Sequence, residues 1–200
     1  TQEIRRLEDA FYTMQEGIRH REEKIEYQAK YDLLTNLYNR YEITDLIRSK
    51  LEAHEVFDVI SFKIVGFREV NNAFGYDSGD ACLESLGSRI KQLGGSAARL
   101  NGSEILWVPE QTVTRDALEN IRENLEDAHL LKGLEIKLKL ALEHLALPKD
   151  ATAIEDLFRH LSIAVQKAED DPGLYQSYKE GMEQEYLKRL AILRELEITL

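Results

Sequence analysis

The segment from Arg99 to Ile105 is the part of this chain best suited to chemistry, because it places a guanidinium, a hydroxyl and a carboxylate around an Asn-Gly pair. A carboxylate at such a turn can help to hold a hard divalent cation, which requires oxygen ligands. Only Glu104 supplies one here, since the residue before it is Ser103. An isolated glutamate at a hairpin tip is by default a solvated surface residue, so this turn alone does not make a metal site.

Three segments, in this order along the chain, resemble the GGDEF domains of diguanylate cyclases. Residues 32–40 read Asp-Leu-Leu-Thr-Asn-Leu-Tyr-Asn-Arg, similar to the family's Asp-x-Leu-Thr-x-Leu-x-Asn-Arg. Residues 67–80 read Phe-Arg-Glu-Val-Asn-Asn-Ala-Phe-Gly-Tyr-Asp-Ser-Gly-Asp, similar to Phe-Lys-x-Ile-Asn-Asp-x-x-Gly-His-x-x-Gly-Asp. The third is a degenerate copy of the Gly-Gly-Asp-Glu-Phe signature, made of Asn101, Gly102, Ser103, Glu104 and Ile105. Chance coincidence of all three in order is remote, and the resemblance covers about residues 30 to 180.

This resemblance implies an α+β or layered α/β fold: a palm-like nucleotidyl cyclase domain whose central, mostly antiparallel sheet is flanked by helices. A long N-terminal helix precedes the domain and a C-terminal helix follows it. In the family, two domains each hold one GTP and two Mg²⁺ ions, and a 3′-oxygen attacks the partner's α-phosphate to build cyclic di-GMP. The metals neutralise charge and aim the nucleophile.

Both metal-binding positions of the family have changed in this chain. Lys63 stands at the first metal-binding aspartate, four residues before Phe67, and Ser103 stands at the other, the third signature letter. Two like unit charges about 4 Å apart repel by roughly 4 kcal/mol at an effective dielectric near 20, so an ammonium at a dication's place is costly. We therefore expect no metal, no cofactor, no catalytic residue and no cyclase activity in this domain.

The phosphate-binding and product-binding positions have changed too. Residues 160–169 align with the family's Ala-Asp-x-Ala-x-x-x-Ala-Lys helix and place Glu169 where a lysine contacts the triphosphate. Lys167 is two residues away, about 200° round a helix, and faces elsewhere. The family's product-inhibition motif, Arg-x-x-Asp, is represented by Gln92 and Gly95, which cannot form its guanidinium and carboxylate contacts. Neither tight GTP binding nor feedback by cyclic di-GMP at this site is expected.

The family's guanine-binding pair is retained as Asn71 and Asp80. A carboxylate can accept hydrogen bonds from guanine N1 and N2, and the NH₂ group of an amide side chain can donate to the acceptor atoms of guanine. Alternatively, both are helix-boundary residues, with Asp80 in a first turn where acidic groups favour the helix dipole. A sharper hypothesis makes Lys63 a fixed positive charge that permits weak, magnesium-independent nucleotide binding, which calorimetry with GTP, with and without magnesium, would test.

Residues 1–30 predict a helix with an apolar seam sustained for about four heptads. The seam is formed by Ile4, Leu7, Phe11, Met14, Ile18 and Ile25, with Arg21 and Gln28 interrupting the d positions. The helix either packs on its own domain or joins two copies in a parallel coiled coil. We favour the coiled-coil homodimer, because a lone helix of this length would leave its apolar stripe in water.

Beyond this helix, apolar periodicity and turn residues predict alternating helices and strands, typical of a layered α/β domain. We expect helices at 39–53, within 71–93 after a loop, at 114–131, at 152–169 after a Thr152-x-x-Glu155 capping box, and at 180–200. Strands are expected at 56–65, 97–100, 105–108, 134–145 and 175–178, with a turn containing Asn-Gly joining the second and third.

Composition narrows the partners and the compartment. There are 37 acidic and 26 basic residues and a net charge of −11, so a nucleic acid would be repelled and is not expected as a partner. Cys82 is the single cysteine, which we expect in the core of a protein from a reducing compartment. No apolar run approaches the roughly 20 residues of a membrane span, so we expect no membrane contact in this fragment and a cytoplasmic location. The chain reads as a piece excised from a larger protein.

The tail gives one further resemblance. Residues 178–183, followed by Arg189, Leu190, Leu193 and Leu196, look like the segment that links a GGDEF domain to an EAL phosphodiesterase domain. The alternative is an amphipathic helix that folds back on the sheet.

We therefore expect a signalling helix at 1–30, a degenerate GGDEF domain at 31–178 and a linker helix at 179–200. Such a domain would be a catalytically inactive regulatory or dimerisation module in bacterial cyclic di-GMP signalling, and would pass the stalk's geometry to a downstream EAL-like domain. The alternatives are a GTP-binding allosteric sensor and a residual diguanylate cyclase that uses unusual residues.

Overall fold

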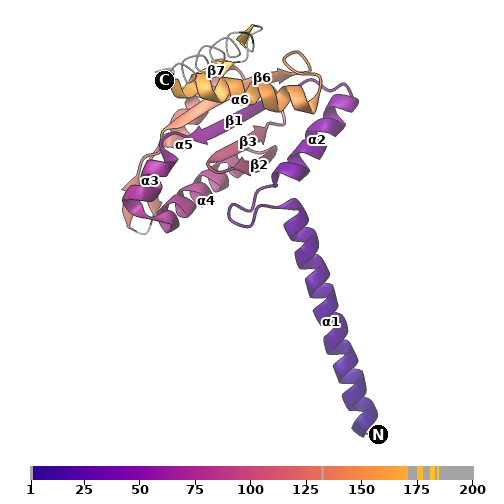
Figure 1. The fold of residues 1–200 in the computed structure, drawn as a ribbon. Coiled ribbons are helices and arrows are strands. Elements are labelled where there is room, and N and C mark those ends of the chain that lie inside the picture. Colours follow the sequence, from indigo (N-terminus) through magenta and orange to yellow (C-terminus); the bar gives the residue numbers. More distant parts are fainter. Residues whose placement is uncertain (1, 132, 171–174, 178–180, 183, 185–200) are drawn as a thin grey trace, which may run out of the picture.

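The computed structural model describes residues 2–131, 133–170, 175–177, 181, 182 and 184. Helices and strands are interspersed along the chain after a long first helix (Figure 1). The helices are α1 (Gln2–Lys30), α2 (Arg40–Glu52), α3 (Phe67–Phe74), α4 (Tyr76–Gln92), α5 (Arg115–Glu126) and α6 (Ile154–Asp170). The strands are β1 (Phe57–Ile64), β2 (Ser96–Asn101), β3 (Glu104–Val108), β4 (His129–Leu131), β5 (Leu134–Ile136), β6 (Leu140–Leu147) and β7 (Tyr175–Ser177).

The main sheet has five strands in the order β2-β3-β1-β6-β7. The central strand β1 pairs antiparallel with β3 on one side and with β6 on the other, whereas β7 runs parallel to β6. Strands β4 and β5 form a separate two-stranded hairpin. The predicted mostly antiparallel sheet flanked by helices is therefore confirmed.

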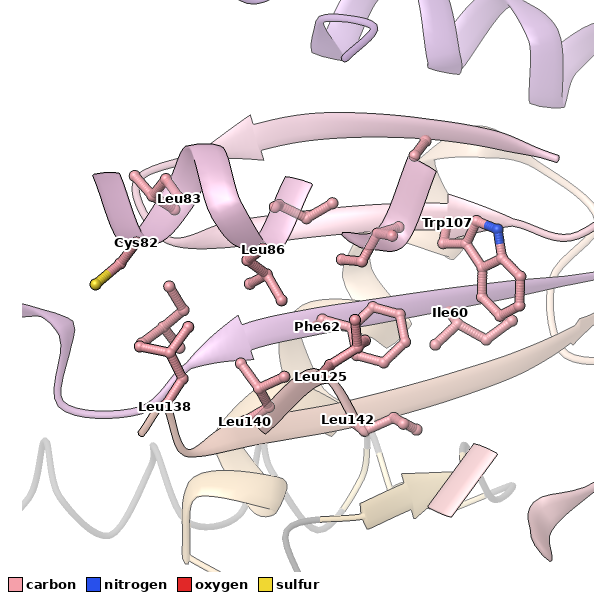
Figure 2. Close-up of a cluster of buried hydrophobic side chains, with 14 of the residues drawn as sticks. Ile60, Phe62, Cys82, Leu83, Leu86, Trp107, Leu125, Leu138, Leu140 and Leu142 are labelled. Carbon is pink, nitrogen blue, oxygen red and sulfur yellow. The ribbon is translucent and has the colours of Figure 1, made fainter. Parts of the chain in front are cut away.

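Helices cover both faces of this sheet because β1 is apolar on both sides. Ile60, Phe62 and Ile64 pack with the apolar stripes of α4 and α5 (Figure 2), whereas Phe57 and Val59 pack with those of α2 and α6. Alternate residues of a strand point to opposite faces, so this split follows from the strand's geometry. Cys82 lies fully buried on the α4 side, as predicted.

Two of the expected elements are divided in the structure. The predicted strand 134–145 is β5 followed by β6, and the predicted helix 114–131 is α5 followed by β4. The helix gives way to β4 because His129 is fully buried, with its Nδ1 2.7 Å from Ser85 Oγ and its Nε2 2.8 Å from the Leu125 carbonyl oxygen. Arg89 also donates to the carbonyls of Asp127 and Ala128. These tertiary contacts outweigh the helical period of the sequence.

Three further boundaries differ from the expectation or lie beyond the description. The loop and helix predicted within 71–93 are the end of α3 and the whole of α4, separated at Gly75, where φ is 84°. Helix α6 begins at Ile154 rather than directly after Thr152. The helix expected at 180–200 lies almost wholly outside the described residues.

Helix α1 projects away from the domain instead of packing on it (Figure 1). Its seam residues expose 58% (Ile4), 52% (Phe11), 56% (Met14), 47% (Ile18) and 65% (Ile25) of their surface, and the side chain of Leu7 is outside the description. The alternative in which this helix packs on its own domain is therefore wrong. Within the described part of the chain, no helix is long and apolar enough to cross a membrane.

Candidate functional site

The degenerate signature forms the tip of the β2–β3 hairpin, as predicted. Asn101 is the last residue of β2 and pairs with Glu104, so Gly102 and Ser103 form the two-residue loop. Gly102 has a φ of 45°, a conformation that glycine adopts without strain. Ile105, the last signature residue, is fully buried in the core on the α4 side.

The two changed metal positions lie together at one end of β1. Lys63 is the direct cross-strand partner of Glu104. Ser103 Oγ donates a hydrogen bond of 3.4 Å to the carbonyl oxygen of Ile64, and the backbone N–H of Ile64 donates to the carbonyl oxygen of Ser103. The serine hydroxyl is thus turned toward the end of β1.

Glu104 is only half exposed, and it accepts a hydrogen bond of 2.9 Å from Ser61 Oγ. The expectation of a solvated surface glutamate is therefore wrong. The cause is the register: Ser61 lies two residues before Lys63 on β1, so its side chain points to the same face of the sheet as that of Glu104.

A second carboxylate on this face, Glu143, was not among the predicted site residues. It lies on β6 directly opposite Ser61, and its exposed fraction is 0%. A single acidic residue within the apolar run of β6 was the available signal, because glutamate is almost never fully buried without a partner.

These residues do not fit the metal that the family implies. Hard cations take carboxylate oxygens, but the two family positions offer an ammonium and a hydroxyl that already contacts a backbone carbonyl. Among the residues that the structure describes, no group of three or more His, Cys, Asp or Glu side chains could hold a metal ion.

The predicted guanine-binding residues are brought together where α3 meets α4. Asn71 Oδ1 is buried with no hydrogen-bond partner among the described residues, and it lies over Gly79, where an added Cβ would be only 1.9 Å away. Asp80 follows Gly79 and is exposed. Helix α4 begins at Tyr76, and Asp77 is the acidic residue of its first turn, so the placement of Asp80 in that turn is wrong.

The remaining predicted positions are described only in part. The backbone of Lys167 and Glu169 lies in α6, but their side chains are outside the description. Gln92 is the last residue of α4. Gly95 has a φ of 74°, and a Cβ added there would lie 2.4 Å from the carbonyl oxygen of Val108. This product-site position therefore has no room for an aspartate.

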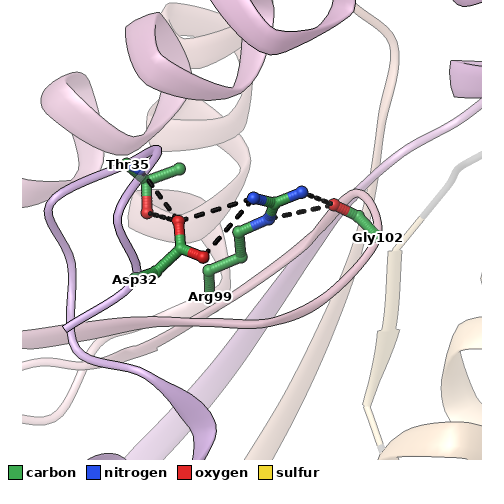
Figure 3. Close-up of polar contacts among 4 residues, drawn as sticks. All are labelled: Asp32, Thr35, Arg99 and Gly102. Carbon is green, nitrogen blue, oxygen red and sulfur yellow. Dashed lines mark hydrogen bonds and ion pairs between the residues drawn. The ribbon is translucent and has the colours of Figure 1, made fainter. Parts of the chain in front are cut away.

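An ion pair ties the signature turn to residues 32–40, the first of the three segments that resemble the GGDEF family (Figure 3). The Arg99 guanidinium donates to both carboxylate oxygens of Asp32, at 3.4 and 3.5 Å, and to the carbonyl oxygen of Gly102, at 3.1 and 2.9 Å. The backbone and hydroxyl of Thr35 also donate to Asp32. Burial raises the pKa of Asp32, but the Thr35 hydrogen bonds and the Arg99 charge outweigh it and hold that pKa below its ordinary value.

Residues 32–40 also join the end of α1, the helix that we call the stalk, to the signature hairpin. The rings of Tyr27, Tyr31 and Tyr38 form a continuous stack, with centroids 4.6 and 5.3 Å apart. The backbone of Tyr38 pairs with β2, donating to Ala97 and accepting from Arg99. The end of α1 and the signature hairpin therefore share one set of contacts, which sequence reasoning did not predict.

Comparisons with known proteins point to the same family as the sequence resemblance. The family model "Diguanylate cyclase, GGDEF domain" matches residues 29–173. An uncharacterized signaling protein of Caulobacter vibrioides is 28% identical over 88% of this chain, and the bifunctional diguanylate cyclase/cyclic di-GMP phosphodiesterase MucR of Pseudomonas aeruginosa is 25% identical over 84%. The chain spans only 23% and 26% of the length of these two relatives.

A solved structure of the coiled coil and GGDEF domain of DgcB from Caulobacter crescentus has the same fold. It superposes with a TM-score of 0.66 at 19% identity, over 86% of this chain and 97% of that chain. Because the family model spans β1, β2, β3 and β6 of the sheet, the helices on both of its faces and the signature hairpin, this chain belongs to the GGDEF domain family.

Proposed function

We propose that this chain is a catalytically inactive GGDEF domain that acts as a regulatory and dimerisation module in cyclic di-GMP signalling. The observation that carries the proposal is the pairing of Lys63 with Glu104 at the end of β1, where the family's chemistry requires carboxylates around two magnesium ions. A positive side chain at that point opposes the binding of a dication and of its triphosphate complex.

The regulatory role is supported by the junction between stalk and domain. The tyrosine stack, the backbone pairing of Tyr38 with β2 and the Arg99 ion pair connect α1 to the hairpin through the segment 31–39. A stalk whose geometry is set upstream can bias the domain only by its differential interaction with two states. This contiguous set of contacts is a physical route for such a bias.

The proposed organisation is a signalling helix at 1–30, the GGDEF domain at 31–178 and a linker helix at 179–200. The whole protein would act in the cytoplasm and carry a downstream EAL-like phosphodiesterase domain that this module regulates. The name of MucR, which combines a cyclase with a cyclic di-GMP phosphodiesterase, supports that arrangement.

The purified chain is expected to produce no cyclic di-GMP from GTP with Mg²⁺ or Mn²⁺. A companion variant with Lys63→Asp, Ser103→Asp and Glu169→Lys restores the family's residue types, and we expect measurable turnover from it if the scaffold is intact. Nucleotide products would be separated by chromatography, with Lys139→Asp, the same type of substitution at an exposed position on the loop before β6, as the control. Turnover by the unmodified chain would refute the proposal.

A second candidate function is a GTP-binding sensor, and the α3–α4 contact favours it. Asn71 has a buried side-chain oxygen with no hydrogen-bond partner in the described part of the chain. Asp80 lies beyond the first turn of α4, so local capping does not explain it. If this is the function, calorimetry will detect guanine-selective binding that is lost in Asp80→Ala and kept in Asp77→Ala. Equal heats for GTP and ATP would exclude it.

A further inference from the structure

One face of the sheet carries three charged side chains grouped around Ser61. They are Lys63 on β1, Glu104 on β3 and Glu143 on β6, three neighbouring strands. Toward the other end of the strands, the same face is made of residues that pack under α2 and α6, such as Val59, Leu106 and Leu145. The charges are thus grouped at the end of the sheet that carries the signature turn.

The strand register places these three residues at neighbouring positions on adjacent strands. Lys63 is directly opposite Glu104, and Ser61 is directly opposite Glu143. The Ser61–Glu104 hydrogen bond of 2.9 Å is a diagonal contact, between residues offset by two positions across the β1–β3 pair. Lys63 and Glu143 have the same offset across the β1–β6 pair, and a lysine side chain is long enough to span it.

The charge of this group also needs a cation. Glu143 is fully buried, and a carboxylate removed from water is strongly destabilising unless a charge or hydrogen bonds compensate it. Glu104 brings a second negative charge to the adjoining strand. Of the β1, β3 and β6 residues that point to this face, Lys63 is the one with a positive charge.

We propose that Lys63 is a resident cation whose ammonium lies between Glu104 and Glu143, pairs with both and compensates one of their two negative charges, so that this end of the sheet is stable without a divalent ion. Lys63 is then more than the loss of a metal ligand. Its ammonium, which is covalently attached to the chain, takes the place of the metal ion beside the two carboxylates. The inference does not depend on the regulatory role proposed above, because it concerns only the charge balance of the folded chain.

The first test is thermal unfolding in EDTA. Lys63→Met keeps the length of the side chain and removes its charge, and we expect its melting temperature to fall by about 10 °C, as for other broken buried ion pairs. Lys63→Arg should remain within a few degrees of the unmodified chain. The matched control is Lys139→Met, an exposed lysine on the loop before β6, which should leave the melting temperature unchanged.

Replacing the carboxylate of Glu143 with a neutral amide should restore stability to the Lys63→Met variant. Lys63→Met combined with Glu143→Gln is expected to regain at least half of the lost melting temperature, which also keeps the test available if Lys63→Met alone does not fold. If Lys63→Met is as stable as Lys139→Met, or if Glu143→Gln gives no rescue, the proposal is overturned.

The second test replaces the resident cation with a third carboxylate. Lys63→Asp should be destabilised in EDTA and should recover several degrees in millimolar Mg²⁺ or Mn²⁺, whereas the unmodified chain should show no shift. A metal-dependent shift of the unmodified chain equal to that of Lys63→Asp would contradict the proposal. Both readouts are independent of nucleotide turnover, so this inference and the proposed function can fail separately.

Discussion

A chain that combines Met14→Glu with Ile18→Glu is expected to be monomeric at concentrations where the unmodified chain is a dimer. Both residues lie on the apolar seam of α1, and about half of each side chain's surface is exposed in the single chain. In a parallel coiled coil, neighbouring d and a positions insert between the helices, so the variant would bury four carboxylates. Losing four apolar side chains, each worth about 1.5–3 kcal/mol, should weaken the dimer at least about a thousandfold.

Sedimentation equilibrium measures this effect directly, and circular dichroism checks that the helix remains. Tyr12→Glu combined with His20→Glu is the matched control, because both residues are exposed and occupy heptad positions away from the seam. This control should remain dimeric. The dimerisation proposal fails if the unmodified chain is monomeric throughout the accessible concentration range, or if the seam variant associates as strongly as the control.

Gly95→Ala is expected to lower the free energy of unfolding by about 4 kcal/mol, the largest loss we anticipate for adding one methyl group to this chain. The added Cβ would lie 2.4 Å from the Val108 carbonyl oxygen and 3.0 Å from Pro109 Cα, both backbone atoms that cannot move aside cheaply. The φ of 74° adds a conformational cost of about 1–2 kcal/mol. Urea unfolding followed by tryptophan fluorescence would report the change, since Trp107 lies in the same core.

Gly94→Ala separates the two contributions to this loss. Gly94 has a φ of 81°, close to that of Gly95, but its added Cβ would make only ordinary contacts with Glu110, at 3.9 Å and beyond. It should therefore lose only the conformational part, about 1–2 kcal/mol. If the two variants are equally destabilised, steric closure at position 95 is not the reason why this product-site position lacks a side chain.

Much of the fold could be predicted from the sequence because local signals agreed with the tertiary structure. The hairpin at 96–108 follows from two short apolar runs around a glycine turn, and α2 is capped by Asn39, whose side chain accepts from the Glu42 backbone. The seam of α1 was readable from its heptads alone. In each case the element's own residues decide its conformation.

Three features that sequence reasoning missed or misjudged depend on residues distant in sequence, and a fourth is local. The half-buried environment of Glu104 requires Ser61, 43 positions away, and the break between α5 and β4 requires Ser85 to meet His129. Glu143 could be noticed as an acidic residue in an apolar strand, but its place opposite Ser61, diagonal to Lys63, depends on the register of β1 and β6. Asp80 was misplaced because a one-turn shift in where α4 starts changes which residue meets the helix dipole.

Because α1 is long, a small change of angle at its junction with the domain, where the tyrosine rings stack, moves its far end a large distance. A helix of 29 residues is roughly 43 Å long, so a tilt of about 5° at the domain end sweeps its far end through roughly 4 Å. Conversely, a displacement of about one ångström at the far end changes the angle of α1 at the domain end only slightly. In the coiled-coil dimer proposed above, a signal would therefore act best as a rotation of the two α1 helices or as a change in the angle between them, and either change would alter the packing of the stacked tyrosine rings.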